Sequence, residues 1–227
     1  MMEITKRKFV TPGEVIATGP LRTENNVYRD GDKIISTCVG ISEIFENSVR
    51  VMALSGIYMP RIDDAVIGKV QSTSLMFWEL DINSCYVGIL RADEVFGRDY
   101  SASSNDLSSK LRKGDLILAR IANFDRSRDP LLTIKSRGLG KIESGELIKI
   151  SPMTIPRLIG RQGATIQTIE SNTNARIKIG QNGWVVVSCE DSSGLLKAIK
   201  VIKMIDSQSH VPDLMERVKS LLESEGE

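Results

Sequence analysis

A pair of glycines inside a helical pattern constrains the fold of this chain more than any other feature of its sequence. The stretch PRLIGRQGATIQTI places Gly160 and Gly163 on either side of Arg161 and Gln162, and apolar residues at helical spacing precede and follow them. Each glycine costs about 0.5–1 kcal/mol relative to alanine inside a helix. The pair therefore predicts a break between two helices.

The elements around this break follow a definite order. The stretch ELIKIS predicts a strand before it, and ARIKIGQNGWVVVSC predicts two strands after it, joined at the hairpin-forming pair Asn182-Gly183. The next helix has an apolar stripe of Leu196, Ile199, Ile202 and Ile205. A last helix begins at Pro212 and has on one side Leu214, Val218, Leu221 and Leu222.

This order and the segment IGRQGATI resemble the KH domain, whose signature is I-G-x-x-G-x-x-I. The resemblance implies a type I KH domain (βααββα) over residues 142–227, with an extra C-terminal helix and a loop that clamps single-stranded RNA. The RNA-binding residues expected here are Arg157, Gly160, Arg161, Gln162 and Gly163. The glycines would let a sugar-phosphate chain approach, and the helix starting near Ala164 would direct its positive end at phosphates. A plain turn between helices is the alternative.

Five short strands precede this domain and predict an OB-type β-barrel over residues 61–141. They are AVIGKV, FWELDI, CYVGIL, GDLILARIANF and PLLTIKS, and the long loop before the fourth contains Leu107 and Leu111 at helical spacing. The block resembles an S1-type RNA-binding barrel, although it lacks a GAFV-like stretch and the histidine often found on the binding face. Strand alternation assigns Trp78, Leu80 and Ile82 to the core, and Phe77 to the other face beside two carboxylates.

Basic residues are the other candidates for RNA contact on the barrel. Lys135 and Arg137 alternate with Leu132 and Ile134, so they should point to solvent. Two further groups lie in loops, namely Lys110, Arg112 and Lys113, and Arg126 and Arg128. The groups either form one phosphate-facing rim or are ordinary solvated surface.

The first 60 residues predict a small β-rich domain. A Gly31-Asp32 turn precedes the β-branched pair Ile34-Ile35, and a turn near Glu46-Asn47 precedes alternation through Val49, Val51 and Ala53. A few short strands with exposed edges usually need a partner surface. The whole chain is thus predicted to be an α+β multidomain protein.

Composition narrows the function further. Thirty basic and twenty-nine acidic residues give a net charge of +1, which is low for a chain that binds nucleic acid tightly alone. Cys38, Cys85 and Cys189 are far apart and are expected to be buried free thiols, and the single histidine, His210, is expected at a helix boundary. No metal or cofactor is expected. No apolar run is long enough to span a bilayer and the N-terminus is unlike a signal peptide, so a cytoplasmic protein without membrane contact is expected.

The three blocks together resemble the S1–KH RNA-binding cap subunit of the archaeal exosome, from about Val10 to Leu222. The anchors include TPGEVIA, YRDGDKI, VIGKV, PRLIGRQGATI and GQNGWV. The resemblance implies that three caps sit on a hexameric ring of RNase-PH-like subunits, alone or mixed with zinc-ribbon caps. The N-terminal domain would dock on the ring, and the S1 domains would surround the pore. The cap, itself not catalytic, would feed the 3′ end of single-stranded, A-rich RNA to the ring.

The resemblance also implies that the turn Gly180-Gln181-Asn182-Gly183 packs the KH domain against the barrel rather than touching RNA. Two other functions remain open. A free-standing RNA-binding or translation-associated factor would use the same modules. A polynucleotide phosphorylase also has KH and S1 modules, but in the opposite order and behind two catalytic domains for which this chain has no room.

Overall fold

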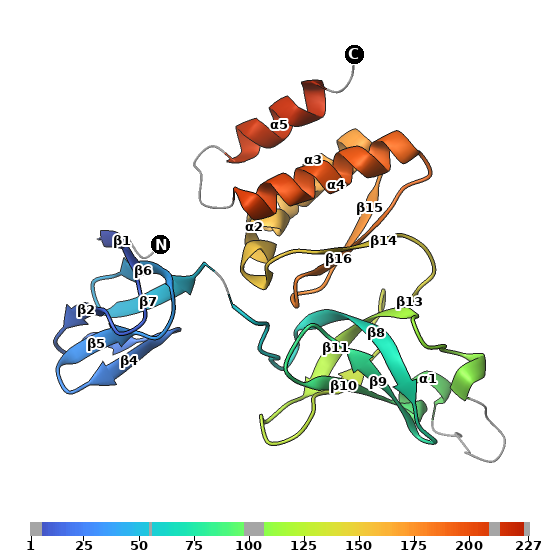
Figure 1. The fold of residues 1–227 in the computed structure, drawn as a ribbon, viewed down its shortest axis with the longest axis horizontal. Helices are drawn as coiled ribbons and strands as arrows, with labels where there is room; N and C mark the ends of the chain where they lie inside the picture. Colours follow the sequence, from blue (N-terminus) through green and yellow to red (C-terminus); the bar gives the residue numbers. More distant parts are fainter. Residues whose placement is uncertain (1–5, 55, 98–106, 209–213, 225–227) are drawn as a thin grey trace. The chain divides into compact units, whose positions relative to one another are not determined.

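The computed structural model describes residues 6–54, 56–97, 107–208 and 214–224 (Figure 1). The chain divides into two units, Met1–Gly56 and Ile57–Glu227. The predicted α+β content is confirmed, since a β-rich first unit is followed by a barrel and an α+β domain in the second. Among the described residues, no helix is long and apolar enough to cross a membrane.

Two small sheets form the N-terminal unit. One has the order β1 (Lys6–Val10), β6 (Gly40–Ile44), β7 (Ser48–Ala53), β3 (Arg22–Thr23), and the other β2 (Val15–Thr18), β5 (Lys33–Ser36), β4 (Val27–Asp30). Their buried side chains are Val10, Ile34, Phe45, Val49 and Val51. Both predicted turns are confirmed: Gly31, at a φ of 57°, joins β4 to β5, and residues 45–47 join β6 to β7.

The second unit begins with a closed five-stranded barrel, as predicted. Its strands are β8 (Ala65–Thr73), β9 (Phe77–Asp81), β10 (Val87–Arg91), β11 (Leu116–Asn123) and β12 (Leu131–Thr133). β12 closes the barrel by pairing with β10 and with the second half of β11, while β13 (Gly140–Ile142) pairs with the first half of β11. Two short helical pieces, α1 (Ala92–Phe96) and η1 (Leu107–Ser109), complete it.

Alternation along the strands sets the barrel core. Trp78, Leu80 and Ile82 are fully buried, as predicted, and Phe77 is half-buried on the other face. The indole Nε1 of Trp78 donates to the Leu111 carbonyl oxygen at 3.3 Å. Leu107 and Leu111 are themselves buried and belong to the same core.

The C-terminal part has the predicted βααββα order and an extra helix. Its elements are β14 (Glu146–Lys149), η2 (Pro152–Thr154), α2 (Ile155–Ile159), η3 (Arg161–Gly163), α3 (Ala164–Thr173), β15 (Arg176–Ile179), β16 (Trp184–Ser188), α4 (Ser192–Ser207) and α5 (Leu214–Ser224). The sheet order is β14-β16-β15, and Figure 1 shows α3 and α4 along this sheet with α5 beyond them. Pro212 and His210 lie outside the described residues.

Two sequence predictions about side-chain burial were wrong. Leu196 is 66% exposed, because the core-facing stripe of α4 runs through Leu195 and Ala198 before reaching Ile199, Ile202 and Ile205. None of the three cysteines, which are free thiols, is fully buried, and Cys85 is exposed. Cys85 lies in the β9–β10 loop, outside the alternating strands.

The barrel and the KH part are joined through the turn after β15, as predicted. Asn182 is fully buried. The pairing of β8 with β9 ends at Lys69–Asp81, and the side-chain amide of Asn182 bonds to the backbone of β8 just beyond that pair. Its Oδ1 accepts from the Ile67 amide at 3.2 Å, and its Nδ2 donates to the carbonyl oxygens of Ile67 and Ile82 at 2.7 and 2.8 Å. The Asn182 carbonyl accepts from Asn83 Nδ2 at 2.7 Å.

Candidate nucleic-acid interface

The Gly-x-x-Gly loop is a tight, strained connection between α2 and α3. Gly160 has φ 75° and ψ 179°, Gln162 has φ 52°, and Gly163 has φ 82°. Arg161 and Gln162 are exposed at its tip. No side chain caps the first turn of α3. The loop therefore presents one guanidinium, one amide and the positive end of α3 to an approaching anion.

The two glycines are needed for different reasons. A Cβ atom on Gly160 would lie 2.8 Å from the Thr165 amide nitrogen and closer still to the Thr165 hydroxyl, so this position is closed by the protein itself. A Cβ on Gly163 would meet nothing nearer than 3.6 Å. The missing Cβ atom of Gly160 therefore makes room for Thr165, whereas the Cβ position of Gly163 is open.

Alanine substitutions separate these two roles. Gly160→Ala is expected to lower the free energy of unfolding by about 2–3 kcal/mol, since it combines a Gly-only conformation with a clash. Gly163→Ala is expected to cost about 1 kcal/mol, the usual penalty for a left-handed conformation with open space. Urea unfolding of the two variants checks the difference. Equal losses would contradict a special role for the Gly160–Thr165 contact.

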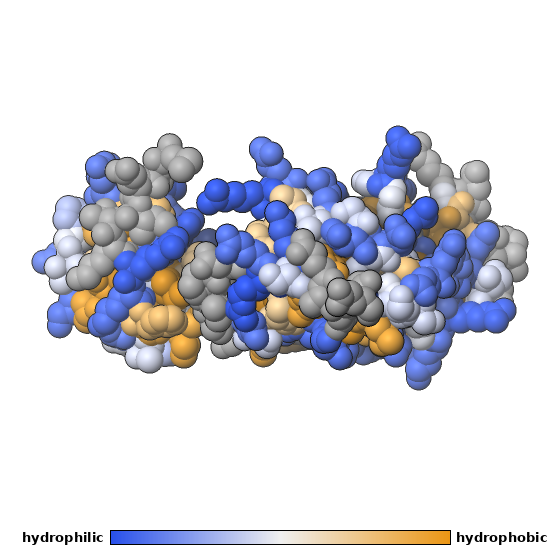
Figure 2. All heavy atoms as spheres, turned by 90° about the horizontal axis from the view of Figure 1, so that it is seen from above, coloured by the Kyte–Doolittle hydropathy of each residue, from blue (hydrophilic) through white to orange (hydrophobic). Residues whose placement is uncertain are grey.

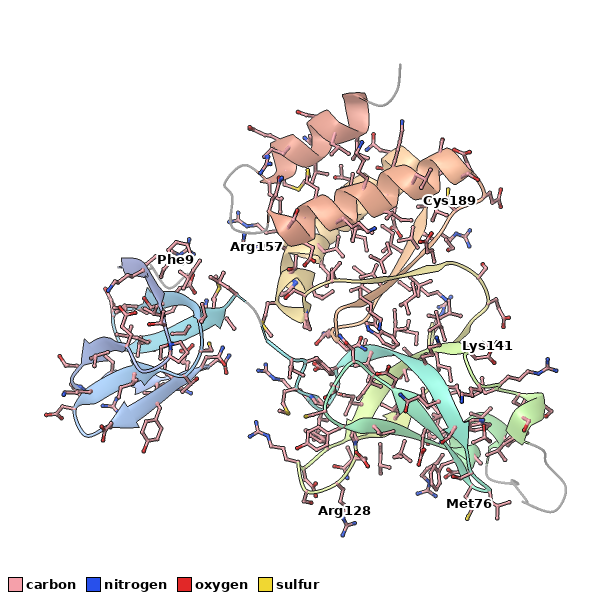
Figure 3. All side chains as sticks on the ribbon, in the orientation of Figure 1. Phe9, Met76, Arg128, Lys141, Arg157 and Cys189 are labelled. Carbon is pink, nitrogen blue, oxygen red and sulfur yellow. The ribbon has the colours of Figure 1, made fainter. Side chains whose placement is uncertain are left out.

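Arg157 lies on α2, close in sequence to the loop (Figure 3). It is half-buried, whereas Arg161 is exposed. The loop thus places one fully accessible cation at its tip and a second, less accessible one on the preceding helix.

Two groups of basic residues in the barrel lie at opposite ends of β11. Lys110, Arg112 and Lys113 precede β11, whereas Arg126 and Arg128 follow it. β11 has eight residues, and at about 3.3 Å per residue its ends are roughly 25 Å apart. Figure 3 labels Arg128, which follows β11, and Lys141 of β13, which pairs with Ile117 near the start of β11. Lys110, Arg112 and Lys113 therefore lie at one end of β11, and Arg126 and Arg128 lie at the other.

Lys135 and Arg137 are exposed, as predicted, but they differ in their surroundings. The Lys135 ammonium pairs with Glu94 at 2.7 Å, and Glu94 also accepts from the Thr133 hydroxyl. An ion pair of this kind lowers the positive charge that Lys135 offers to a phosphate. Arg137 is exposed in the segment after β12.

An aromatic pair next to Arg126 and Arg128 was missed by the sequence analysis. The rings of Tyr86 and Phe124 meet edge to face at 4.8 Å between centroids, and the Tyr86 hydroxyl donates to the Arg126 carbonyl at 3.2 Å. A cavity of about 330 Å³ lies beside Phe124. It is lined by Ile89, Asn123, Phe124, Asp125, Arg128, Asp129 and Leu131. Tyr86 and Phe124 lie on different loops, so no local pattern reveals them.

Charge in this cavity is mixed. Hydrogen bonds from the Ser127 side chain and backbone lower the pKa of Asp125, so its carboxylate stays ionised beside Arg128. The Asp129 carboxylate accepts from the Val87 amide at 3.0 Å and is held in place by β10. The cavity therefore combines an aromatic edge with one guanidinium and two carboxylates, which suits a flat polar ring better than a bare phosphate.

No group of three or more His, Cys, Asp or Glu side chains capable of holding a metal ion occurs within the part of the chain that the structure describes.

Comparison with known proteins places both ends of the chain in known families. A KH domain model matches residues 145–204, and a model of the exosome RNA binding protein RRP4 N-terminal domain matches residues 7–55. A protein described as an exosome complex RNA-binding protein has a crystal structure with a TM-score of 0.70 and 37% identity, covering 74% of this chain and 97% of that one.

Full-length relatives show the same similarity. The exosome complex component Rrp4 of Nitrosopumilus maritimus is 60% identical over 98% of both chains. Those of Thermofilum pendens and Thermosphaera aggregans are 39% and 38% identical and cover 98% and 97% of this chain, and 95% and 92% of their own lengths. With the RRP4 N-terminal domain, the barrel and the KH domain all in order, the chain belongs to the Rrp4 family of exosome complex components.

Proposed function

We propose that this chain is a non-catalytic RNA-binding cap of an exosome, which binds single-stranded RNA and passes its 3′ end to a degrading ring. Full-length identity of 60% to the exosome complex component Rrp4 of Nitrosopumilus maritimus is the observation that carries this proposal. In this proposal, three copies of the chain bind a hexameric ring of RNase-PH-like subunits in the cytoplasm. Zinc-ribbon caps can replace some of the three copies.

Each block has its own part in this proposal. Residues 1–60 dock on the ring, residues 61–141 form the S1 barrel beside the pore, and residues 142–227 form the KH domain. The turn around Asn182 holds the last two together, so a strand that leaves the KH loop meets the barrel at a set distance.

Two surfaces take the RNA in this proposal. The loop of Gly160, Arg161, Gln162 and Gly163 takes phosphates, with Arg157 behind it. The cavity beside Phe124 takes a base, with Arg126 and Arg128 on the adjacent backbone. Arg137 adds positive charge after β12. Lys135 contributes less because it is paired with Glu94. Lys110, Arg112 and Lys113 contribute less because they lie at the other end of β11 from the cavity.

Weak binding by one chain suits this arrangement. The net charge of +1 provides little general attraction to a polyanion. Three copies around one pore raise the effective concentration of each site for a strand that already touches another, and avidity of this kind adds about 10²–10⁴ to affinity.

Affinity-tagged full-length chain, recovered from nuclease-treated cell extract, tests the proposal. We expect RNase-PH-like subunits in a large complex, identified by mass spectrometry. We also expect phosphate-dependent degradation of oligoadenylate by the complex and none by the purified chain. Recovery of the chain alone, or with ribosomes only, would favour a free-standing RNA-binding factor instead.

A further inference from the structure

The outer face of the β1-β6-β7 sheet in the N-terminal unit has an exposed apolar row. Phe9 pairs with Ile41 and Ile41 with Met52, so the three side chains lie side by side across the strands. Phe9 is 66% exposed and Met52 36%. The opposite face of the same strands supplies the core residues Val10, Val49 and Val51. Figure 2 shows hydrophobic residues at the surface of this unit, at the left.

Two residues further along each strand, the same face has a fixed pair of arginines. Glu43 pairs across the sheet with Arg7 on β1 and Arg50 on β7. Its Oε1 accepts from Arg7 Nε and Nη2 at 3.1 and 2.7 Å, and its Oε2 accepts from Arg50 Nε and Nη2 at 2.9 and 2.7 Å. The Arg50 guanidinium also stacks on Phe45, 5.1 Å from the ring centroid.

This triad is arranged for an acidic ligand. Glu43 is only 1% exposed, and both of its oxygens are already used, whereas the side chains of Arg7 and Arg50 are 59% and 39% exposed. The bonds to Glu43 use Nε and Nη2 of each arginine, and Nη1 of each takes no part in them. Two guanidiniums against one carboxylate give a net charge of +1, and their fixed geometry lowers the entropy lost when a further carboxylate binds.

The second sheet of this unit has no such arrangement. Its outer face also has an apolar row, Val15, Ile35 and Tyr28, and Tyr28 is 63% exposed. Its neighbouring charges, Lys33 and Asp30, are opposite in sign and directly paired across β4 and β5. An acidic surface would gain little there, so this row is a matched control.

We infer that the face of Arg7, Phe9, Ile41, Arg50 and Met52 is the surface that docks on the ring, and that its partner there is an apolar patch with an adjacent Asp or Glu side chain. The inference rests on the proposed function for its partner. A protein partner fits better than RNA. The apolar row forms no hydrogen bonds with phosphates, whereas apolar side chains are typical of the buried centre of a protein interface.

Binding of the full-length chain to the reconstituted RNase-PH-like ring tests this surface. Phe9→Asp is expected to weaken ring binding at least tenfold, because it places a charge in the apolar row. Arg7→Ala is expected to weaken it about threefold to tenfold and to reduce its salt dependence, since one fixed guanidinium is lost. Tyr28→Asp, the same change at similar exposure on the other sheet, is expected to bind within about twofold of wild type. Phe9→Ala, a milder change, repeats the test if Phe9→Asp unfolds.

The outcomes separate the two proposals. If the wild-type chain binds the ring and both Phe9→Asp and Phe9→Ala bind it equally well, the docking surface is overturned and the proposed function is not. If Tyr28→Asp loses ring binding, docking belongs to the other sheet. Normal ring binding with lower oligoadenylate affinity in Arg7→Ala would make the face an RNA contact and also overturn the inference. Failure of the wild-type chain to bind the ring would overturn the proposed function and this surface with it.

Discussion

Asn182→Ala is expected to lower the free energy of unfolding of the barrel–KH unit by about 4 kcal/mol, since buried backbone groups that lose their partners cost about 1–3 kcal/mol each. The side-chain amide of Asn182 supplies the hydrogen bonds of the Ile67 amide and of the Ile67 and Ile82 carbonyls. Alanine supplies none of them. It also leaves a void against β8, because Asn182 is fully buried.

The neighbouring residue provides a matched control. Gln181 is exposed, and only its backbone amide reaches the barrel, donating to the Ala65 carbonyl at 2.7 Å. Gln181→Ala is therefore expected to change stability by less than about 0.5 kcal/mol. Urea unfolding followed by tryptophan fluorescence reports both parts, since Trp78 is in the barrel core and Trp184 lies at the start of β16. A loss below 1 kcal/mol for Asn182→Ala would show that the barrel does not depend on this amide.

Arg161→Asp combined with Gln162→Asp is expected to reduce the affinity of the chain for single-stranded oligoadenylate about 30-fold, which corresponds to about 2 kcal/mol. The change removes a charge-assisted contact and places two carboxylates where phosphates are expected. Both side chains are exposed, and aspartate tolerates the left-handed conformation of Gln162. Negative charge before α3 also suits the positive end of that helix, so stability should be unchanged within about 0.5 kcal/mol.

A control with the same change in net charge separates local contact from general repulsion. Lys203→Asp with Ser207→Asp alters two exposed residues of α4 and is expected to lower affinity no more than about threefold. Fluorescence anisotropy at two salt concentrations measures both variants. If the loop variant is folded and binds as tightly as wild type, the Gly-x-x-Gly loop has no part in RNA binding.

Element types and their order could be predicted from the sequence because each depends on a short stretch. Alternation within one strand was enough to bury Trp78 and Leu80, and the spacing of Leu107 and Leu111 was enough to predict the turn before β11. The helix break at Gly160 was equally local, since glycine weakens a helix wherever it occurs. The role of Asn182 came from resemblance to a family rather than from any period in the chain.

The buried face of α4 could not be predicted from the spacing of apolar residues alone. A helical stripe through Leu196 and one through Leu195 are both compatible with the later isoleucines, and only packing of the helix on the sheet selects between them. The reason for Gly160 was hidden in the same way. Its close neighbour, Thr165, lies across the turn, so the crowding exists only once α3 has folded back.

The amino-acid sequence by itself determined a β-rich block, a five-stranded block and a βααββα block in that order, because propensity and periodicity act within one element. The tertiary structure alone decided which side chains meet. The barrel brought Tyr86 against Phe124 from two different loops. Sheet register placed Arg7 and Arg50 around Glu43. Such pairs depend on the alignment of distant strands, which no single stretch of sequence specifies.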